Sequence, residues 1–206
     1  MFDAGVLTFR EFVMREPLPL ARIQEAVLQF LRNRKDVAVF GAQAVNAYVE
    51  EPRMTQDIDV VSTRSKEFAT ELCDFLADRF KVAVRVRALA ENRGFRIYQV
   101  RRPKNRHLID VRPVDVLPPT RTIGYVKIVA PAELIASKVI AFARRKGQPK
   151  SGTDWRDLAE LLLAFPKLKE SRGFVQERLE AAGVAADVIA VWEDMVAGTI
   201  TRSDDD

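Results

Sequence analysis

The feature that most constrains this chain is a pair of aspartates inside an apolar, strand-like run. In the segment DIDVVS, Asp57 and Asp59 alternate with Ile58 and Val60. Side chains in a strand alternate between its two faces, so both carboxylates point to one side and the apolar side chains to the other. Like charges this close repel each other, and each loses solvation if buried. The pair is therefore costly unless a cation or a basic group lies between the carboxylates.

The composition limits what that cation can be and where the protein works. The chain has 206 residues, and 33 Lys and Arg against 29 Asp and Glu give a net charge of +4, which is compatible with an anionic partner. Cys73 is the only cysteine and His107 the only histidine, so an internal disulfide framework and a Cys/His zinc site are both excluded. A bound metal must use carboxylates. No apolar run reaches membrane-spanning length, so we expect a cytoplasmic protein without a membrane partner.

The order of apolar patterns predicts the fold class. Helical spacing or composition indicates helices over residues 20–34, 42–50 and 65–79, and alternation or short apolar runs indicate strands over residues 37–40, 57–62, 81–88, 95–100 and 107–116. The basic segment RRPKNR reads as a hairpin link, and from Pro131 onward the pattern is helical. Helices and strands alternate first and helices dominate afterwards, which predicts an α/β (α+β) domain over residues 1–128, with N-terminal helices, and an α-helical domain over residues 129–206.

Three positions around the aspartate pair predict a metal and phosphate site. Gly41 ends a short strand and feeds a helix, where backbone N–H groups can face a phosphate. Asp57 and Asp59 share one face, which suits Mg²⁺ or Mn²⁺, hard cations that bridge protein carboxylates to substrate phosphates. Asp110 in HLIDVR is flanked by apolar residues in the same alternating manner and supplies a third carboxylate. Three carboxylates can hold two metal ions, one at an acceptor hydroxyl and one at a leaving pyrophosphate. We expect Asp110 to complete this site and to help deprotonate the acceptor.

Other residues near these positions have competing interpretations. Asp115 is the main rival of Asp110, but it follows Pro113, where the strand should be ending. Arg53 and Thr55 border the aspartate pair in sequence and are candidates for binding phosphate or acceptor, although a turn arginine is more often simply solvated. His107, just before LID, fits a structural or substrate-contacting role better than a catalytic one.

Lys138 has an unusual setting for a lysine. In PAELIASKVIAFARRK it has Leu134 four residues before it and Phe142 four residues after it, so it lies along an apolar helical stripe. A lysine there must reach out to solvent or meet an anion, and a triphosphate between the two domains would satisfy it. On the next helix Asp154 and Asp157 share a face, and they are candidates to orient Lys138 or an acceptor group. An interaction with the helix N-terminus explains them equally well.

These residues resemble a known family. A glycine, a short helix, Asp-x-Asp on a strand and a later lone aspartate on a strand together resemble the nucleotidyltransferase superfamily related to DNA polymerase beta. The pairing of AVNAYVEEPRMTQDIDVV with ELIASKVIAFARRKGQPKSGTDWRDLAELL is similar to the AbiEii/AbiGii toxin-type nucleotidyltransferases and their close relatives. The resemblance covers residues 40–163 in separate pieces, and the Asp-x-Asp context is its most specific part.

Individual positions match that family to different degrees. Lys138 matches a lysine on the first helix after the core, and Asp154 and Asp157 match an Arg/Lys-Asp-x-x-Asp-Leu element on the next helix, with Thr153 in place of the basic residue. The superfamily usually has Gly-Gly or Gly-Ser where this chain has Gly41 and Ala42, so a phosphate-contacting hydroxyl is missing and backbone amides must act instead.

The resemblance implies an activity and partners. It implies Mg²⁺-dependent transfer of a nucleoside monophosphate (NMP) from a nucleoside triphosphate (NTP) to a hydroxyl, with tRNA or another RNA as acceptor and a cognate antitoxin as partner. Small molecules and proteins are acceptors elsewhere in the superfamily, and the sequence does not choose among them. Two other classes remain open: a catalytically weak or inactive nucleotide-binding or interaction module of the same fold, which Ala42 motivates, and a metal-dependent nuclease using Asp110, which lacks a suitable lysine partner.

Overall fold

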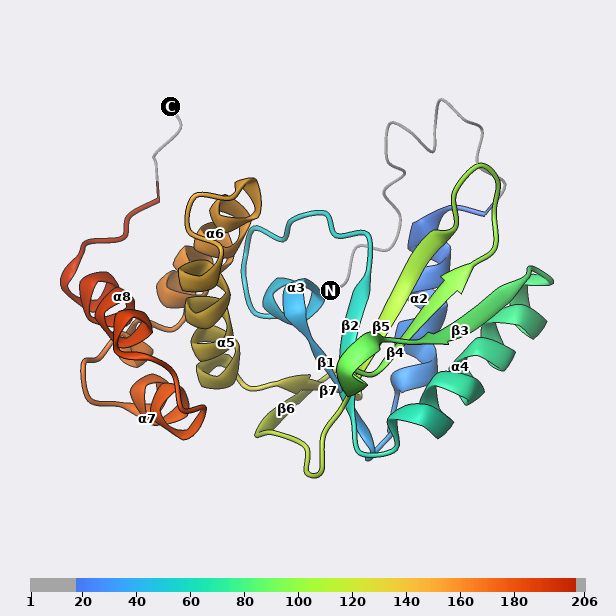
Figure 1. Cartoon of the computed structure of the whole chain (residues 1–206), viewed down its shortest axis with the longest axis horizontal. Helices are drawn as coiled ribbons and strands as arrows, with labels where there is room; N and C mark the ends of the chain where they lie inside the picture. The colour runs from blue at the N-terminus through green and yellow to red at the C-terminus, as the bar shows by residue number, and fades with distance from the viewer. Residues whose placement is uncertain (1–17, 203–206) are drawn as a thin grey trace. The chain divides into compact units, whose positions relative to one another are not determined.

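The computed structural model describes residues 18–202, and Figure 1 shows a mixed β-sheet with its helices followed by further helices. The described residues divide into two compact units. Residues 18–43 and 54–129 form the first, which we call the sheet unit, and residues 44–53 and 130–202 form the second, the helical unit. The predicted α/β (α+β) fold class with C-terminal helices is confirmed, and the sheet is mixed.

Seven strands form the single sheet of the sheet unit, in the order β3-β4-β5-β2-β1-β7-β6. Their bounds are β1 Val37–Phe40, β2 Ile58–Ser62, β3 Val84–Ala88, β4 Phe95–Gln99, β5 Arg106–Pro113, β6 Thr120–Ile123 and β7 Val126–Val129. The central strand β2 runs antiparallel to β1 and parallel to β5, whereas β3, β4 and β5 form an antiparallel meander. The mixed order places the strand that carries Asp59 in the middle of the sheet.

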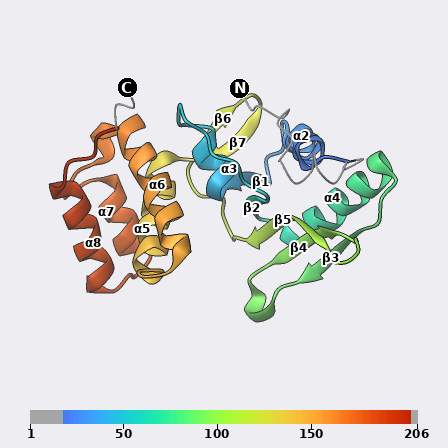
Figure 2. The ribbon, with the colours of Figure 1, turned by 90° about the horizontal axis from the view of Figure 1, so that it is seen from above.

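One face of the sheet, the back face, is covered by helices. Helices α2 (Leu20–Leu31) and α4 (Ser65–Phe80) pack against each other, and α4 also packs on strands β2 to β5 (Figure 2). The back-face side chains are buried and almost all apolar; they include Val39, Ile58, Val60, Ile97, Ile109 and Val111. Burial of these alternate residues fixes the register, because a shift by one residue would turn the apolar set away from the helices.

The sequence prediction missed one hairpin. Strands β6 and β7 pair antiparallel, and β7 adds to β1 in parallel. Gly124 and Tyr125, the two residues between them, both have positive φ (55° and 69°), as the tight turn of a two-residue hairpin requires. The predicted helix over residues 42–50 is also shorter, since α3 spans Gly41–Asn46, and the last predicted strand ends at Pro113 rather than residue 116.

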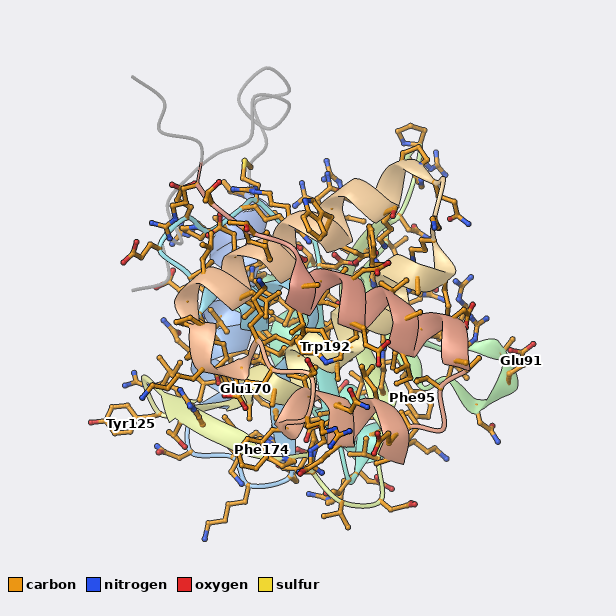
Figure 3. The ribbon with its side chains drawn as sticks, turned by 90° about the vertical axis from the view of Figure 1, so that its left-hand side faces the viewer. Glu91, Phe95, Tyr125, Glu170, Phe174 and Trp192 are labelled. Atoms are coloured by element: carbon orange, nitrogen blue, oxygen red, sulfur yellow. The ribbon has the colours of Figure 1, made fainter. Side chains whose placement is uncertain are left out.

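The helical unit contains four α-helices among its described residues and a short 3-10 turn, Pro166–Leu168. The α-helices that follow the sheet are α5 Pro131–Arg144, α6 Pro149–Ala164, α7 Phe174–Ala181 and α8 Ala186–Ala197. Helix α5 packs against α6, α7 and α8, and Trp192 of α8 (labelled in Figure 3) is fully buried in this core. Among the described helices, none is both long and apolar enough to cross a membrane.

Candidate active site

The carboxylates predicted from the sequence meet on the face of the sheet opposite to the back face, which we call the front face. Asp59 of β2 lies directly opposite Asp110 of β5 in the parallel register. Across the antiparallel pairs, Asp110 lies opposite Arg96 of β4, and Asp59 opposite Phe40 of β1. Residues opposite each other in a sheet share a face. The two carboxylates therefore lie side by side in a row that crosses the sheet.

A β-bulge brings His107 to the same face. Ile97 pairs with Ile109 and the next residue, Tyr98, pairs with His107, so Leu108 is an extra residue in β5. In a regular strand, positions three apart such as 107 and 110 point to opposite faces; the extra residue cancels that difference. The imidazole consequently sits between two carboxylates, with Nε2 2.9 Å from Asp110 Oδ1 and Nδ1 3.3 Å from Asp57 Oδ2.

Asp110 is the most strongly held carboxylate of the site. The Arg96 guanidinium donates two hydrogen bonds of 2.8 Å to its two oxygens, and His107 lies within hydrogen-bonding distance as well. Burial works to raise the pKa of Asp110, but the hydrogen bonds from Arg96 and His107 outweigh it and hold the pKa well below its usual range. Asp110 is thus a fixed negative charge and, while Arg96 holds it, a weak proton acceptor.

Asp59 has the opposite electrostatic setting. Its pKa is raised, first by burial and then by the neighbouring charges of Asp57 and Asp110, which Arg112 only partly offsets. The nearest nitrogen of Arg112 is 3.8 Å from Asp59 Oδ1, and its guanidinium also lies over the Phe40 ring. A buried carboxylate that is crowded by others and only weakly paired is a group that a bound cation would stabilise.

Gly41 is required next to Asp59 for a steric reason. Its φ is +68°, a conformation that side-chain-bearing residues rarely adopt, and a Cβ built there would overlap the Asp59 carboxyl group, at 2.9 Å from its Cγ. The chain leaves β1 through Gly41 and enters α3 at once, with Ala42 as the next residue. Glycine therefore lets the strand-to-helix turn pass against the carboxylate, whereas its predicted role as a phosphate cradle stays a prediction.

The turn before Asp57 is tied to the sheet unit by Thr55. Its hydroxyl donates to the Asp57 carbonyl at 3.3 Å, and its own carbonyl accepts a 2.9 Å hydrogen bond from the Gln24 side chain of α2. These contacts hold the backbone that leads into Asp57. Asp115, the rival of Asp110, is exposed and lies beyond the end of β5.

The remaining predicted residues gather in the helical unit, where they form a buried ionic cluster. Asp157 of α6, 2% exposed, accepts hydrogen bonds from Arg53 Nε at 2.6 Å and Nη2 at 3.0 Å, and from Lys138 Nζ of α5 at 2.5 Å. Asp154, also 2% exposed, accepts from Lys138 at 3.3 Å and from Arg145 at 2.6 Å. The anions that Lys138 meets in this unit are these two carboxylates.

Direct pairing in the cluster favours the charged form of Asp157. Burial works to raise the pKa of Asp157, but the hydrogen bonds and charges of Arg53 and Lys138 outweigh it and lower that pKa. With Arg145, three cations contact these two carboxylates within the part of the chain that the structure describes. Arg53 also holds its own turn, because its backbone N–H and C=O bond the Asn46 side chain. The phosphate-binding roles predicted for Arg53 and Lys138 stay predictions.

The donor set partly fits the metal expected from the sequence. Asp57 and Asp59 supply carboxylate oxygens on one face, and Mg²⁺ is commonly held by one or two carboxylates together with substrate phosphates. Within residues 18–202, no three acidic, histidine or cysteine side chains stand in a geometry that could hold a metal ion. In particular, both Asp110 oxygens face Arg96. Coordination by all three aspartates therefore stays a prediction, and the Asp57–Asp59 pair is the part that fits.

Sequence reasoning did not find three arginines that shape these sites. Arg96 and Arg112 reach the front-face carboxylates only because of strand register, which no local pattern reveals. Arg145 directly follows the last residue of α5, and nothing in the surrounding basic segment predicts its ion pair with Asp154. Lys138 could be found because a lysine in an apolar helical stripe is itself an anomaly.

Two solved structures with a related fold superpose over most of this chain. The polyadenylate synthase of Megavirus superposes with a TM-score of 0.61 at 15% identity, covering 76% of this chain and 34% of that one. The protein JHP933 of Helicobacter pylori superposes with a TM-score of 0.53 at 11% identity, covering 93% and 92%. The chain thus spans about a third of the viral enzyme's length, and at these identities the likeness shows the fold alone.

Sequence comparison gives the family. No curated protein matches this chain significantly. The sequence model described as "Nucleotidyl transferase AbiEii toxin, Type IV TA system" matches residues 26–191, which include the front-face carboxylates, Lys138 and the Asp154–Asp157 element. With that match over most of its length and a nucleotidyltransferase fold, the chain belongs to the AbiEii family of nucleotidyl transferases.

Proposed function

We propose that this protein transfers an NMP from an NTP to a hydroxyl acceptor and releases pyrophosphate. The acceptor oxygen forms a bond to the α-phosphorus, the bond between that phosphorus and the oxygen leading to the β-phosphate breaks, and the hydroxyl proton passes to a base. Asp57 and Asp59 would hold Mg²⁺ or Mn²⁺, and the metal would supply charge neutralisation for the phosphates when bound. Family membership is the coarse support for this activity.

The single observation that carries the proposal is the row of carboxylates on the front face. Asp59 and Asp110 are direct neighbours across β2 and β5, Asp57 and Asp110 share His107, and Gly41 brings the backbone against Asp59 without a side chain. Burial first, and then the charges of Asp57 and Asp110, destabilise the charged form of Asp59, as expected for a residue whose proper partner is a cation. A purely structural role for these strands would not explain why so many charged side chains lie together in the middle of the sheet.

The structure adds a condition to the predicted role of Asp110. For this carboxylate to accept the acceptor's proton or to ligate a metal, Arg96 must first release at least one of its oxygens. While Arg96 holds it, Asp110 lies within hydrogen-bonding distance of His107 and orients that ring. Asp110 therefore acts in the proposal as an anchor of the site, and its further part in metal binding is open to direct test.

The finer parts of the proposal come from the family resemblance. The acceptor is tRNA or another RNA, and a cognate antitoxin is the protein partner. Lys138, held by Asp154 and Asp157, is proposed to contact the triphosphate. Replacement by arginine keeps the charge of this buried cluster, so a fall in NTP affinity with an unchanged melting temperature supports the role, and unchanged NTP affinity argues against it.

Incubation with each labelled NTP, Mg²⁺ or Mn²⁺ and total cellular RNA tests the activity. We expect label to enter RNA with the wild type and not with Asp57→Asn or Asp59→Asn, because the carboxylates that hold the metal are removed. Asp115→Asn is the matched control, since Asp115 is exposed and lies outside the front-face row. Wild-type turnover in either Asp57→Asn or Asp59→Asn would show that these residues do not hold the metal.

A second function keeps the same fold without catalysis. Two observations favour it: Ala42 replaces the usual glycine or serine, and both oxygens of Asp110 are engaged by Arg96. A non-catalytic nucleotide-binding module predicts Mg²⁺-dependent NTP binding with no label transferred to RNA, protein or small molecules. The incubation above therefore separates the two functions.

A further inference from the structure

The front face continues beyond the carboxylates as a strip of basic and aromatic side chains. Opposite residues extend the first row from Asp110 through Arg96 to Arg87 of β3. A second row runs beside it, from Arg85 of β3 through Tyr98 of β4 to His107. The His107 imidazole lies next to the Asp57 carboxylate. Both rows therefore lead from arginines at the edge of the sheet to aspartates near its centre.

The outer part of this strip is open and uncompensated. Arg85 and Arg87 are exposed, and within residues 18–202 neither forms an ion pair with an acidic side chain. Strands β3 (VRVRA) and β4 (FRIYQ) contain no acidic residue. Their apolar side chains alternate toward the back face, where α4 packs on them, so the charges are not a by-product of a wholly solvated strand. The β4–β5 turn adds Arg102 and Lys104, both exposed.

The arrangement matches the demands of a polyanionic acceptor. Phosphates must avoid the aspartates yet bring a hydroxyl to them, and the strip separates the two kinds of charge across neighbouring strands. Strands lie about 4.8 Å apart, so three steps from β3 to β2 span roughly 14 Å, enough for a few residues of an extended strand of nucleic acid. Tyr98, half-buried between the arginines and His107, offers a ring on which a base can stack.

We infer that this strip, formed by Arg85, Arg87 and Tyr98, is the surface along which single-stranded RNA reaches the carboxylates. The inference rests on the proposed function for the chemistry at Asp57 and Asp59, but the surface itself is defined by charge and register. Phosphates bind at the β3 edge, a base stacks on Tyr98, and the acceptor hydroxyl lies at the aspartates. Charge complementarity selects an anionic strand over an apolar or basic partner.

RNA binding is measured without NTP, by fluorescence anisotropy of a short labelled single-stranded RNA with the full chain over a range of salt concentrations. The Arg85→Gln/Arg87→Gln protein should bind about tenfold more weakly, with a plot of log K against log salt shallower by about 0.7 for each phosphate that the variant no longer neutralises. Tyr98→Leu should weaken binding without changing that slope, because stacking releases no counterions. Arg22→Gln, an exposed arginine on α2 of the same unit, is the matched control.

The outcomes separate this inference from the proposed function. If the double variant binds RNA as tightly as wild type and Arg22→Gln, or if the wild type does not bind the RNA, the strip is not an RNA surface. If the double variant loses binding to anionic lipid vesicles but keeps its binding to RNA, the strip is likewise not an RNA surface. NMP transfer to RNA by a double variant with normal RNA affinity would leave the proposed function intact and refute the strip. Strip-dependent RNA binding without transfer supports the strip and refutes the activity. Because both arginines are exposed, the double variant should keep the melting temperature of the wild type, and this measurement confirms that it is folded.

Discussion

Removing the charge of Asp157 should test the buried ionic cluster more sharply than any other change in the helical unit. Asp157→Asn keeps the size and shape of the side chain, so no cavity forms and the perturbation is almost purely electrostatic. The substitution replaces the carboxylate that accepts two hydrogen bonds from the Arg53 guanidinium with a neutral amide. Lys138 retains only its longer hydrogen bond to Asp154.

The expected destabilisation follows from how deeply the partners are buried. Breaking a buried ion pair by removing one partner costs about 3–5 kcal/mol, because the remaining charge stays desolvated. The side chains of Arg53 and Lys138 are 21% and 11% exposed, so solvent relieves part of that cost. Asp154 also still neutralises Lys138. We therefore expect a destabilisation near the lower end, about 3 kcal/mol, or roughly 6–12 °C in melting temperature for a protein of this size.

Thermal unfolding followed by circular dichroism measures the effect against a matched control. Asp194→Asn removes an exposed carboxylate from α8 of the same unit and should change stability by no more than about 0.5 kcal/mol. In a double-mutant cycle, Lys138→Met should cost less in the Asp157→Asn background than in the wild type, since the ion pair between the two residues is already broken there. If Asp157→Asn melts within the range of the Asp194→Asn control, the cluster does not stabilise the helical unit.

Three further predictions follow from the geometry of the two sites. Gly41→Ala should lower the melting temperature more than Gly124→Ala, because both have positive φ but only the first Cβ overlaps Asp59; equal decreases would mean that backbone strain alone is responsible. Without metal, Asp59→Asn should have a higher melting temperature than wild type at pH 7. This difference should shrink as the pH falls through the raised folded pKa of Asp59, because the wild-type carboxyl then becomes neutral too. Melting temperatures of both proteins over a series of pH values measure the difference. For Asp157 the folded pKa is lowered, so the stability that its charge contributes is complete above its unfolded pKa and is lost as the pH falls through the folded pKa. The loss of stability in Asp157→Asn relative to wild type should therefore persist at pH 7 and narrow below about pH 4. A constant loss of stability down to about pH 2 would contradict the assigned cause.

The parts of this protein that could be predicted from sequence are those set by local patterns. The strand that carries Asp59, the turn at Gly41 and the helix pair that carries Lys138 are all marked by alternation or by an anomalous residue in an apolar stripe. The β6–β7 hairpin had a local signal as well, a glycine followed by one residue between two short strand-like runs, but each run is only four residues long. Short runs of this kind carry too little periodicity to be distinguished from a loop.

What sequence could not provide is the set of neighbours that strand register creates. The ion pair between Arg96 and Asp110 depends on which residues of β4 and β5 stand opposite each other, and fourteen positions along the chain separate them. The same holds for Arg53 and Asp157, whose separation is 104 positions. Local propensity carries no information on such pairs, because they are chosen by burial of the back face and of the helix core.

The bulge at Leu108 shows how one such non-local detail determines the chemistry of the site. A regular β5 would keep Asp110 on the front face and turn His107 to the back face. The side chains that pack beneath α4 on that face are almost all apolar, so the imidazole would lose its two carboxylate partners. With the extra residue, Leu108 and Ile109 are both buried, and His107 joins Tyr98 and Arg85 in a second row parallel to the first. Bulges recur beside active sites because they re-aim one side chain without disturbing the strands on either side. In this sheet the re-aimed side chain is the only histidine of the chain, and its position between Asp57 and Asp110 makes the residue just before β2 and the middle of β5 one electrostatic unit.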